Sequence, residues 1–296
     1  MPNDSAVPVL GSTRANHHAR AMKNLLLLCI LAASQCAFAG DVFPRSEPRP
    51  FNLADELEVD ATIGGYPIWH GEKKWRLYEL ARSDSGGTAQ SVPLGRMRVF
   101  QTESKRLVAT MFVSANLAQA YSSDWTDEPC KRDDMLFKAN LGGKFRDVNC
   151  VTINHLTNYG LNPTGAPAES LFALFKEQGI DVPPTMLQIS FTRYSTNMRW
   201  LVVSLTVNPE LMGFPRDAEP KWTQSPWHKS KAFGSAEKKQ FIDALAAWSL
   251  QFGKQMDVAF DKNPQAFTSI SSWRAISSFK PGTTGATGER PKVTLD

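Results

Sequence analysis

The chain has 296 residues, of which 42% are hydrophobic, and it carries 33 lysines and arginines against 29 aspartates and glutamates. This length and apolar content suit one large domain or two small ones with a buried core. The basic excess is small, so the composition disfavours nucleic-acid binding, which needs clustered cations that displace counterions from phosphates.

Residues 1–39 have the three-part pattern of a secretory signal peptide. Basic residues precede the apolar run 25–33, which is followed by the motif Ala-Phe-Ala at 37–39. The run is far shorter than the roughly 20 apolar residues of a membrane-spanning helix, so we expect no transmembrane anchor. Met22 is an alternative start that leaves a compact leader. The sequence therefore predicts a periplasmic or secreted protein whose mature chain begins at Gly40.

Two cysteines, Cys130 and Cys150, remain in the mature chain, which keeps 30 basic residues against 28 acidic ones. An isolated pair in an oxidising compartment is most simply a disulfide. Closing this loop stabilises the fold by about 3 kcal/mol on the chain-entropy model. The alternative is a reactive cysteine, but there is no C-x-x-C motif and neither cysteine has a histidine within two residues.

The first half of the mature chain predicts a meander of β-strands. Residues 40–52 hold three prolines and are expected to form an extended lead-in to a single domain over 53–279. Short runs rich in β-branched and aromatic residues then alternate with Gly-rich or charged turns, including a Gly-rich turn at 83–87. These predicted strands are 57–63, 75–80, 95–101, 107–115 and 150–153.

The second half predicts helices around a long hairpin. A helix over 167–178 has proline at its start and Gly179 as its stop. Apolar and polar residues alternate over 187–192, and with the turn at 195–197 and the run 198–207 that follows it they predict two antiparallel strands over 186–207. A helix over 236–260, capped by Ser235, has one apolar face. Its apolar residues are Phe241, Leu245, Trp248, Phe252 and Met256.

These elements predict an α+β fold in which an antiparallel sheet packs against at least two helices. The stretch 208–235 holds four prolines and is expected to be irregular. Residues 267–279 fit either a short helix or an edge strand. The tail 280–296 has too few apolar residues to fold alone, so we expect it to be disordered.

Catalytic and metal chemistry are limited by the supply of histidines. The mature chain keeps His70, His155 and His228, and no two are spaced to share one face of a helix or strand, so we predict no metal site. No phosphate-binding glycine motif is present, and we predict no cofactor. His155, near the proposed disulfide at a strand end, is the best catalytic candidate. The alternative is a hydrogen-bonded packing residue.

The strongest binding candidate is the segment 221–233, in which aromatic and basic residues alternate. Trp222, Trp227, His228 and Lys229 could stack on and hydrogen-bond to a glycan, a peptide or another envelope protein. The alternative is that the tryptophans anchor an irregular loop to the core.

The sequence as a whole favours an exported, non-enzymatic binding or interaction protein of the periplasm or envelope. The alternative is a hydrolase whose site combines His155 with acidic residues from separate segments. Whether the protein is an enzyme stays open at this stage.

Overall fold

The computed structural model describes residues 40–71, 74–85, 92–118, 128–142, 147–159, 166–195, 199–218 and 221–278. All of them belong to one compact unit. The leader predicted at 1–39 and the tail predicted at 280–296 lie outside the described residues.

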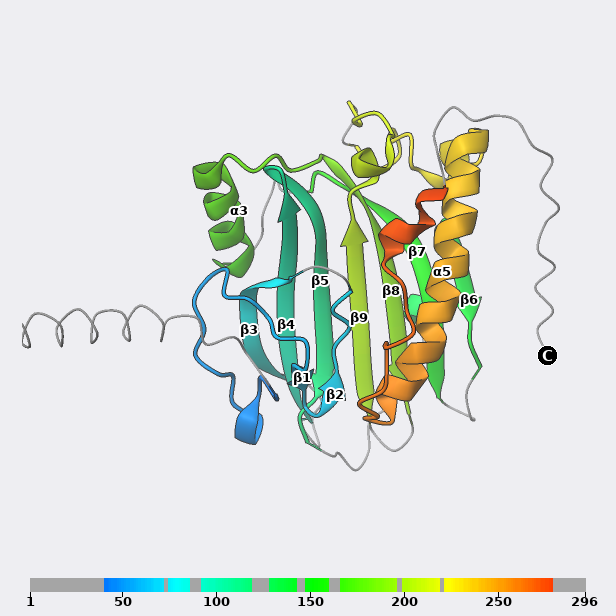
Figure 1. Ribbon diagram of the computed structural model, residues 1–296. Coiled ribbons are helices and arrows are strands. Elements are labelled where there is room, and N and C mark those ends of the chain that lie inside the picture. Colours follow the sequence, from blue (N-terminus) through cyan, green and yellow to red (C-terminus); the bar gives the residue numbers. More distant parts are fainter. Residues whose placement is uncertain are drawn as a thin grey trace, which may run out of the picture. The chain divides into compact units, whose positions relative to one another are not determined.

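The main element is a seven-stranded antiparallel sheet with the strand order β3-β4-β5-β9-β8-β7-β6 (Figure 1). The central β5–β9 pairing joins the meander at one side to the hairpin β8–β9 at the other. The predicted α+β class and the long hairpin are therefore confirmed. The strands are β3 (Arg76–Ser85), β4 (Val92–Glu103), β5 (Arg106–Asn116), β6 (Phe137–Asn140), β7 (Val148–Thr157), β8 (Thr185–Tyr194) and β9 (Trp200–Val207).

Several predicted strand boundaries were wrong. The strand expected at 57–63 is reduced to β1 (Thr62–Ile63), which pairs with β2 (Tyr66–Pro67) in a separate two-stranded sheet. The turn expected from residue 83 starts later, because β3 stays paired with β4 as far as Ser85. The strand expected at 150–153 is longer, since pairing with β8 extends β7 to Thr157.

Both predicted helices are confirmed, and they cover opposite faces of the sheet. α5 (Ala236–Phe260) starts at Ser235, whose hydroxyl accepts a hydrogen bond from the amide of Lys238 at 3.3 Å. It lies along β8 and β7 with its apolar stripe towards the sheet (Figure 1). α3 (Ala166–Gln178) packs Leu171 and Phe175 on Phe100, which points to the other face.

The N-terminal segment completes the layer that contains α5. Val42 and Phe43 are buried in the same core cluster as Tyr66 and Trp69, so part of the lead-in belongs to the core. The remaining elements are short, and none of the described helices is long and apolar enough to cross a membrane. They are η1 (Pro44–Ser46), α2 (Glu128–Lys131), η2 (Pro209–Met212), α4 (Lys229–Ala232) and η3 (Trp273–Ser278).

Candidate binding pocket

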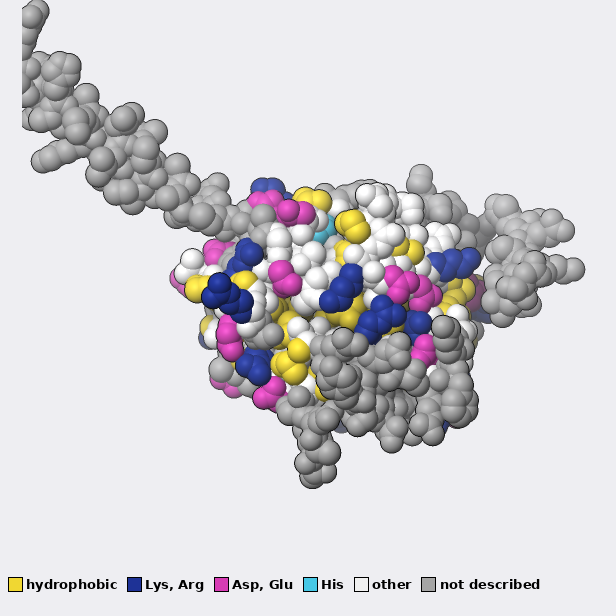
Figure 2. Space-filling model, turned by 90° about the horizontal axis from the view of Figure 1, so that it is seen from below, with side chains coloured by type: hydrophobic (Ala, Val, Ile, Leu, Met, Phe, Trp, Pro, Cys, Tyr) yellow, Lys and Arg dark blue, Asp and Glu magenta, His cyan; other side chains and the backbone are white. Residues whose placement is uncertain are grey.

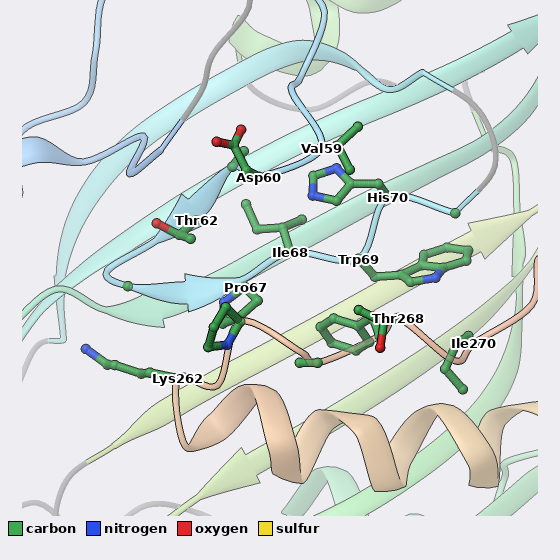
Figure 3. Close-up of a pocket in the computed structure, with 16 residues that line it drawn as sticks. Val59, Asp60, Thr62, Pro67, Ile68, Trp69, His70, Lys262, Thr268 and Ile270 are labelled. Carbon is green, nitrogen blue, oxygen red and sulfur yellow. The ribbon is translucent and has the colours of Figure 1, made fainter.

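A pocket of about 480 Å³ lies between the segment 59–71 and the segment 262–270 that follows α5 (Figure 3). This volume is within the range of small-molecule sites. Most of the lining is apolar: Val59, Ala61, Pro67, Ile68, Trp69, Pro264, Ala266, Phe267 and Ile270. The side chains in the lining that carry hydrogen-bonding groups are Asp60, Thr62, Trp69, His70, Lys262 and Thr268.

The wall made by 59–71 is held in place at the tight turn between β1 and β2. Gly64 and Gly65 have φ of +58° and +79°, and a Cβ on Gly64 would lie 2.6 Å from the backbone oxygen of Asn116, so this position needs glycine. The Asp41 carboxylate accepts hydrogen bonds from the amides of Gly64 and Gly65 at 3.2 and 2.9 Å. The Tyr66 hydroxyl donates to the Asn116 side chain at 2.9 Å, which ties the turn to the sheet.

The opposite wall, residues 262–270, is tied both to α5 and to the β1–β2 turn. The Lys262 ammonium donates to the Gly64 carbonyl at 2.6 Å and lies 4.7 Å from the centre of the Tyr66 ring. The Phe267 amide donates to the Gln255 side chain of α5 at 3.0 Å. Lys262 and Phe267 have φ of 58° and 68°. Non-glycine residues in this conformation are strained, and such strain gathers at functional sites.

Trp69 gives the pocket a rigid aromatic surface. Its ring makes edge-to-face contacts with Trp75, Trp248 and Phe252 at centroid distances of 6.3, 5.8 and 5.5 Å. The Trp75 indole N–H also donates to the His70 carbonyl at 2.7 Å. The backbone beneath the pocket is therefore fixed by packing in the core.

His70 contributes a polar side chain to the wall of the pocket. Its Nε2 is buried and has no hydrogen-bond partner among the described residues. Burial lowers the pKa of His70 from 6.5 to about 4, although the nearby Asp60 charge acts in the opposite direction. The imidazole is therefore neutral near pH 7. A buried polar atom without a partner costs free energy, and a ligand that binds it recovers that cost.

The catalytic candidate His155 lies in β7 and is 1% exposed. The ring of Trp222 stacks on it, with centroids 5.0 Å apart. His155 Nε2 is 3.0 Å from the Trp222 carbonyl oxygen, and because a carbonyl only accepts, Nε2 carries the hydrogen. Nδ1 is then an acceptor, buried and without a partner among the described residues. Burial lowers the pKa of His155, so the ring is neutral near pH 7. The Trp222 ring covers it.

Asp217 lies in the loop next to His155, and two hydroxyl groups hold its carboxylate. Its carboxylate accepts from Thr185 at 2.7 Å and from Ser225 at 2.6 Å. Ser225 is fully buried. These contacts pin the irregular loop to the start of β8, and Ser225 is placed as a structural group rather than as an accessible nucleophile.

The four binding candidates of 221–233 do not lie together on the surface. Trp222 is partly buried, with the His228 ring edge-on to it at 4.6 Å. Lys229 is exposed and donates to the Asp133 carbonyl at 2.6 Å. Trp227 is 1% exposed, so its ring is not available at the surface. The structure thus brings Trp222 and His228 next to His155, and places Trp227 in the core.

The predicted disulfide between Cys130 and Cys150 is present, with Cα atoms 5.8 Å apart. It joins α2 to β7, the strand that also carries His155. Such a bond is compatible with an extracytoplasmic location. No group of three or more potential metal ligands occurs within the described residues.

The C-terminal end of α5 also borders a second, more polar hollow of about 220 Å³. Arg193 lies there between carboxylates, 2.9 Å from Asp257 and 3.5 Å from Asp147, and over the ring of Phe260 at 4.7 Å. On this end of the molecule basic and acidic side chains alternate, without a field of one sign (Figure 2). The charges in this hollow satisfy one another, which makes it a weaker ligand site than the apolar pocket.

From the sequence, His70 counts among the three histidines of the mature chain, but the pocket around it was missed. The available signals were the Gly-Gly turn at 64–65, the adjacent Trp69 and the end of the amphipathic helix pattern near 260. None of them shows that two segments separated by 198 residues, as Gly64 and Lys262 are, form one cavity.

No protein-family model, curated protein or solved structure matches this chain. Function therefore has to be argued from the geometry of the site.

Proposed function

We propose that this protein is an exported binding protein, and that it holds a small molecule in the pocket between 59–71 and 262–270. The observation that carries the proposal is the buried Nε2 of His70, which has no partner among the described residues, at an apolar cavity of about 480 Å³. An apolar lining with a few convergent polar groups is the usual character of a ligand site.

The rigidity of the pocket also supports binding. Its walls are fixed by the Asp41 carboxylate, by the Lys262 contact with Gly64 and by the aromatic cluster under Trp69. A cavity that exists before the ligand arrives avoids the cost of ordering loops on binding. The strained backbone at Phe267 belongs to the same wall.

Export to the periplasm or the exterior is part of this proposal. The basic, apolar and Ala-Phe-Ala elements of residues 1–39 support it, as does the bond between Cys130 and Cys150. Intact-mass measurement of protein recovered from the cell envelope is expected to give a chain that starts at Gly40. A retained leader would contradict export.

The binding test compares one substitution in the lining of the pocket with one at the neighbouring residue, outside the lining. Thr268 is exposed and lines the pocket, so Thr268→Trp places an indole in the opening. The neighbouring Ser269 is also exposed but does not line the pocket, so Ser269→Trp is the matched control.

The mature protein and both variants are purified without denaturation and studied by native mass spectrometry and by thermal-shift screening of a small-molecule library. We expect bound mass or a raised melting temperature for the wild type and Ser269→Trp, and neither for Thr268→Trp. Ligands that bind Thr268→Trp as well as the wild type would place binding elsewhere and refute the proposal.

A further inference from the structure

The two charged side chains of the pocket differ in their availability to a ligand. The Lys262 ammonium already donates to the Gly64 carbonyl and lies over the Tyr66 ring. Asp60 is exposed, and no lysine or arginine of the described segments forms an ion pair with it. The charge that remains open to a ligand is therefore negative.

Asp60 and His70 belong to the same wall. Figure 3 shows both side chains above Ile68, on the segment that also carries Trp69. Within the part of the chain that the structure describes, the buried Nε2 of His70 has no partner, and a neutral imidazole offers an acceptor there in one of its tautomers. An anionic carboxylate and a neutral acceptor thus lie at one side of an apolar cavity.

Resting on the proposed function, we propose that the ligand is an amphipathic amine. Its protonated amino group would lie between the Asp60 carboxylate and His70 Nε2, donating hydrogen bonds to both. Its apolar body would lie on Ile68 and Trp69, facing Phe267.

Ligands of other charge fit these groups less well. A carboxylate would face Asp60 with like charge. A neutral alcohol satisfies His70 but leaves Asp60 without a counter-charge. Because Asp60 is exposed, its ion pair with the amino group alone raises the affinity only a few-fold. The charge-assisted hydrogen bond to His70 raises the expected preference for an amine over a neutral alcohol to about tenfold.

The test uses three probes of matched shape: 2-phenylethylammonium, 2-phenylethanol and 3-phenylpropanoate. Dissociation constants for the mature protein are measured by isothermal titration calorimetry at pH 7 and low salt. We expect the ammonium to bind about tenfold more tightly than the alcohol, and the carboxylate to bind most weakly. All three are expected to lose binding in Thr268→Trp.

Three further variants assign the contact. Asp60→Asn is expected to reduce the preference for the ammonium over the alcohol to less than about threefold. Glu58→Gln removes a like charge two residues away, outside the pocket, and is expected to leave the preference unchanged. His70→Phe keeps a ring in place of the imidazole and is expected to weaken binding of the ammonium by about tenfold.

The outcomes separate this inference from the proposal on which it rests. If the alcohol or the carboxylate binds at least as tightly as the ammonium and Thr268→Trp blocks it, the pocket stands and the amine assignment falls. If Asp60→Asn and Glu58→Gln lower the preference for the ammonium over the alcohol by the same factor, the contact assigned to Asp60 is also overturned. If none of the probes binds the wild type more tightly than Thr268→Trp, the proposed function fails as well.

Discussion

Replacing the two tryptophans of the 221–233 segment one at a time tests whether that segment is anchored as the structure shows. Trp227 is 1% exposed, and its ring packs against Phe214 and Phe241 at centroid distances of 4.9 and 6.1 Å. The Lys238 ammonium lies 5.5 Å from the ring centre. Trp227→Ala empties this site, and we expect it to lower the free energy of unfolding by about 3–5 kcal/mol.

Trp222→Ala is the internal comparison. Trp222 is partly buried, and its ring stacks on His155 at 5.0 Å and meets the His228 ring edge-on at 4.6 Å. The substitution keeps the backbone carbonyl that His155 binds, so the loss is the ring contact and part of the buried area. We expect a cost of about 1–2 kcal/mol.

The same substitution also has a pH signature. Removing the Trp222 ring exposes His155, so the pKa of His155 should rise towards its ordinary value. A lowered folded-state pKa costs stability as the pH falls below the unfolded value of about 6.5. The wild type bears this cost in full and the variant only in part. The stability difference between them should therefore shrink between pH 8 and pH 5.

Urea denaturation followed by far-ultraviolet circular dichroism gives both free energies, and NMR titration of the imidazole protons gives the pKa. Trp227→Phe serves as the control, since it retains an aromatic ring and should cost less than Trp227→Ala. A loss below about 1 kcal/mol for Trp227→Ala, or an unchanged pKa of His155 in Trp222→Ala, would refute this account of the segment.

Three other experiments test contacts elsewhere in the fold. Replacing Cys130 and Cys150 by serine should cost about 3 kcal/mol in urea denaturation, and an unchanged midpoint would show that the bond does not constrain the unfolded chain. Burial lowers the pKa of His70 to about 4, so the wild type loses stability as the pH falls from 6.5 to 4. His70→Gln removes this loss, which is at most about 3 kcal/mol. Wild-type and variant curves of unfolding free energy against pH that run parallel would contradict it. Arg193→Met removes the ion pairs of this arginine with the buried Asp147 carboxylate and with Asp257, and it should cost clearly more than Lys239→Ala, which breaks an exposed pair and should cost less than about 0.5 kcal/mol; equal losses would refute the difference.

The elements with strong periodicity could be predicted from the sequence. The spacing of apolar residues gave α5 within a residue at each end, and strict alternation gave the β8–β9 hairpin. Residues 57–63 are equally rich in strand formers, but the turn at 64–65 leaves only Thr62 and Ile63 paired with β2. Strand propensity there was overridden because the segment covers the core instead of joining the sheet.

The pocket could not be predicted from local sequence because its geometry depends on distant contacts. Lys262 and Phe267 adopt positive φ although neither is glycine or asparagine, so their sequence does not encode this backbone. Contacts with Gly64 and Gln255 hold them there.

Position in the fold rather than chemistry distinguishes the two histidines as candidate sites. His70 and His155 are both neutral near pH 7, and each has one buried ring nitrogen without a partner among the described residues. The Trp222 ring covers His155, so a ligand reaches that nitrogen only if the loop moves. His70 lines a cavity that already exists in the structure, on the same wall as Asp60. A ligand pays a lower cost to bind in a cavity that already exists, which is why we propose the ligand site at His70 rather than at His155.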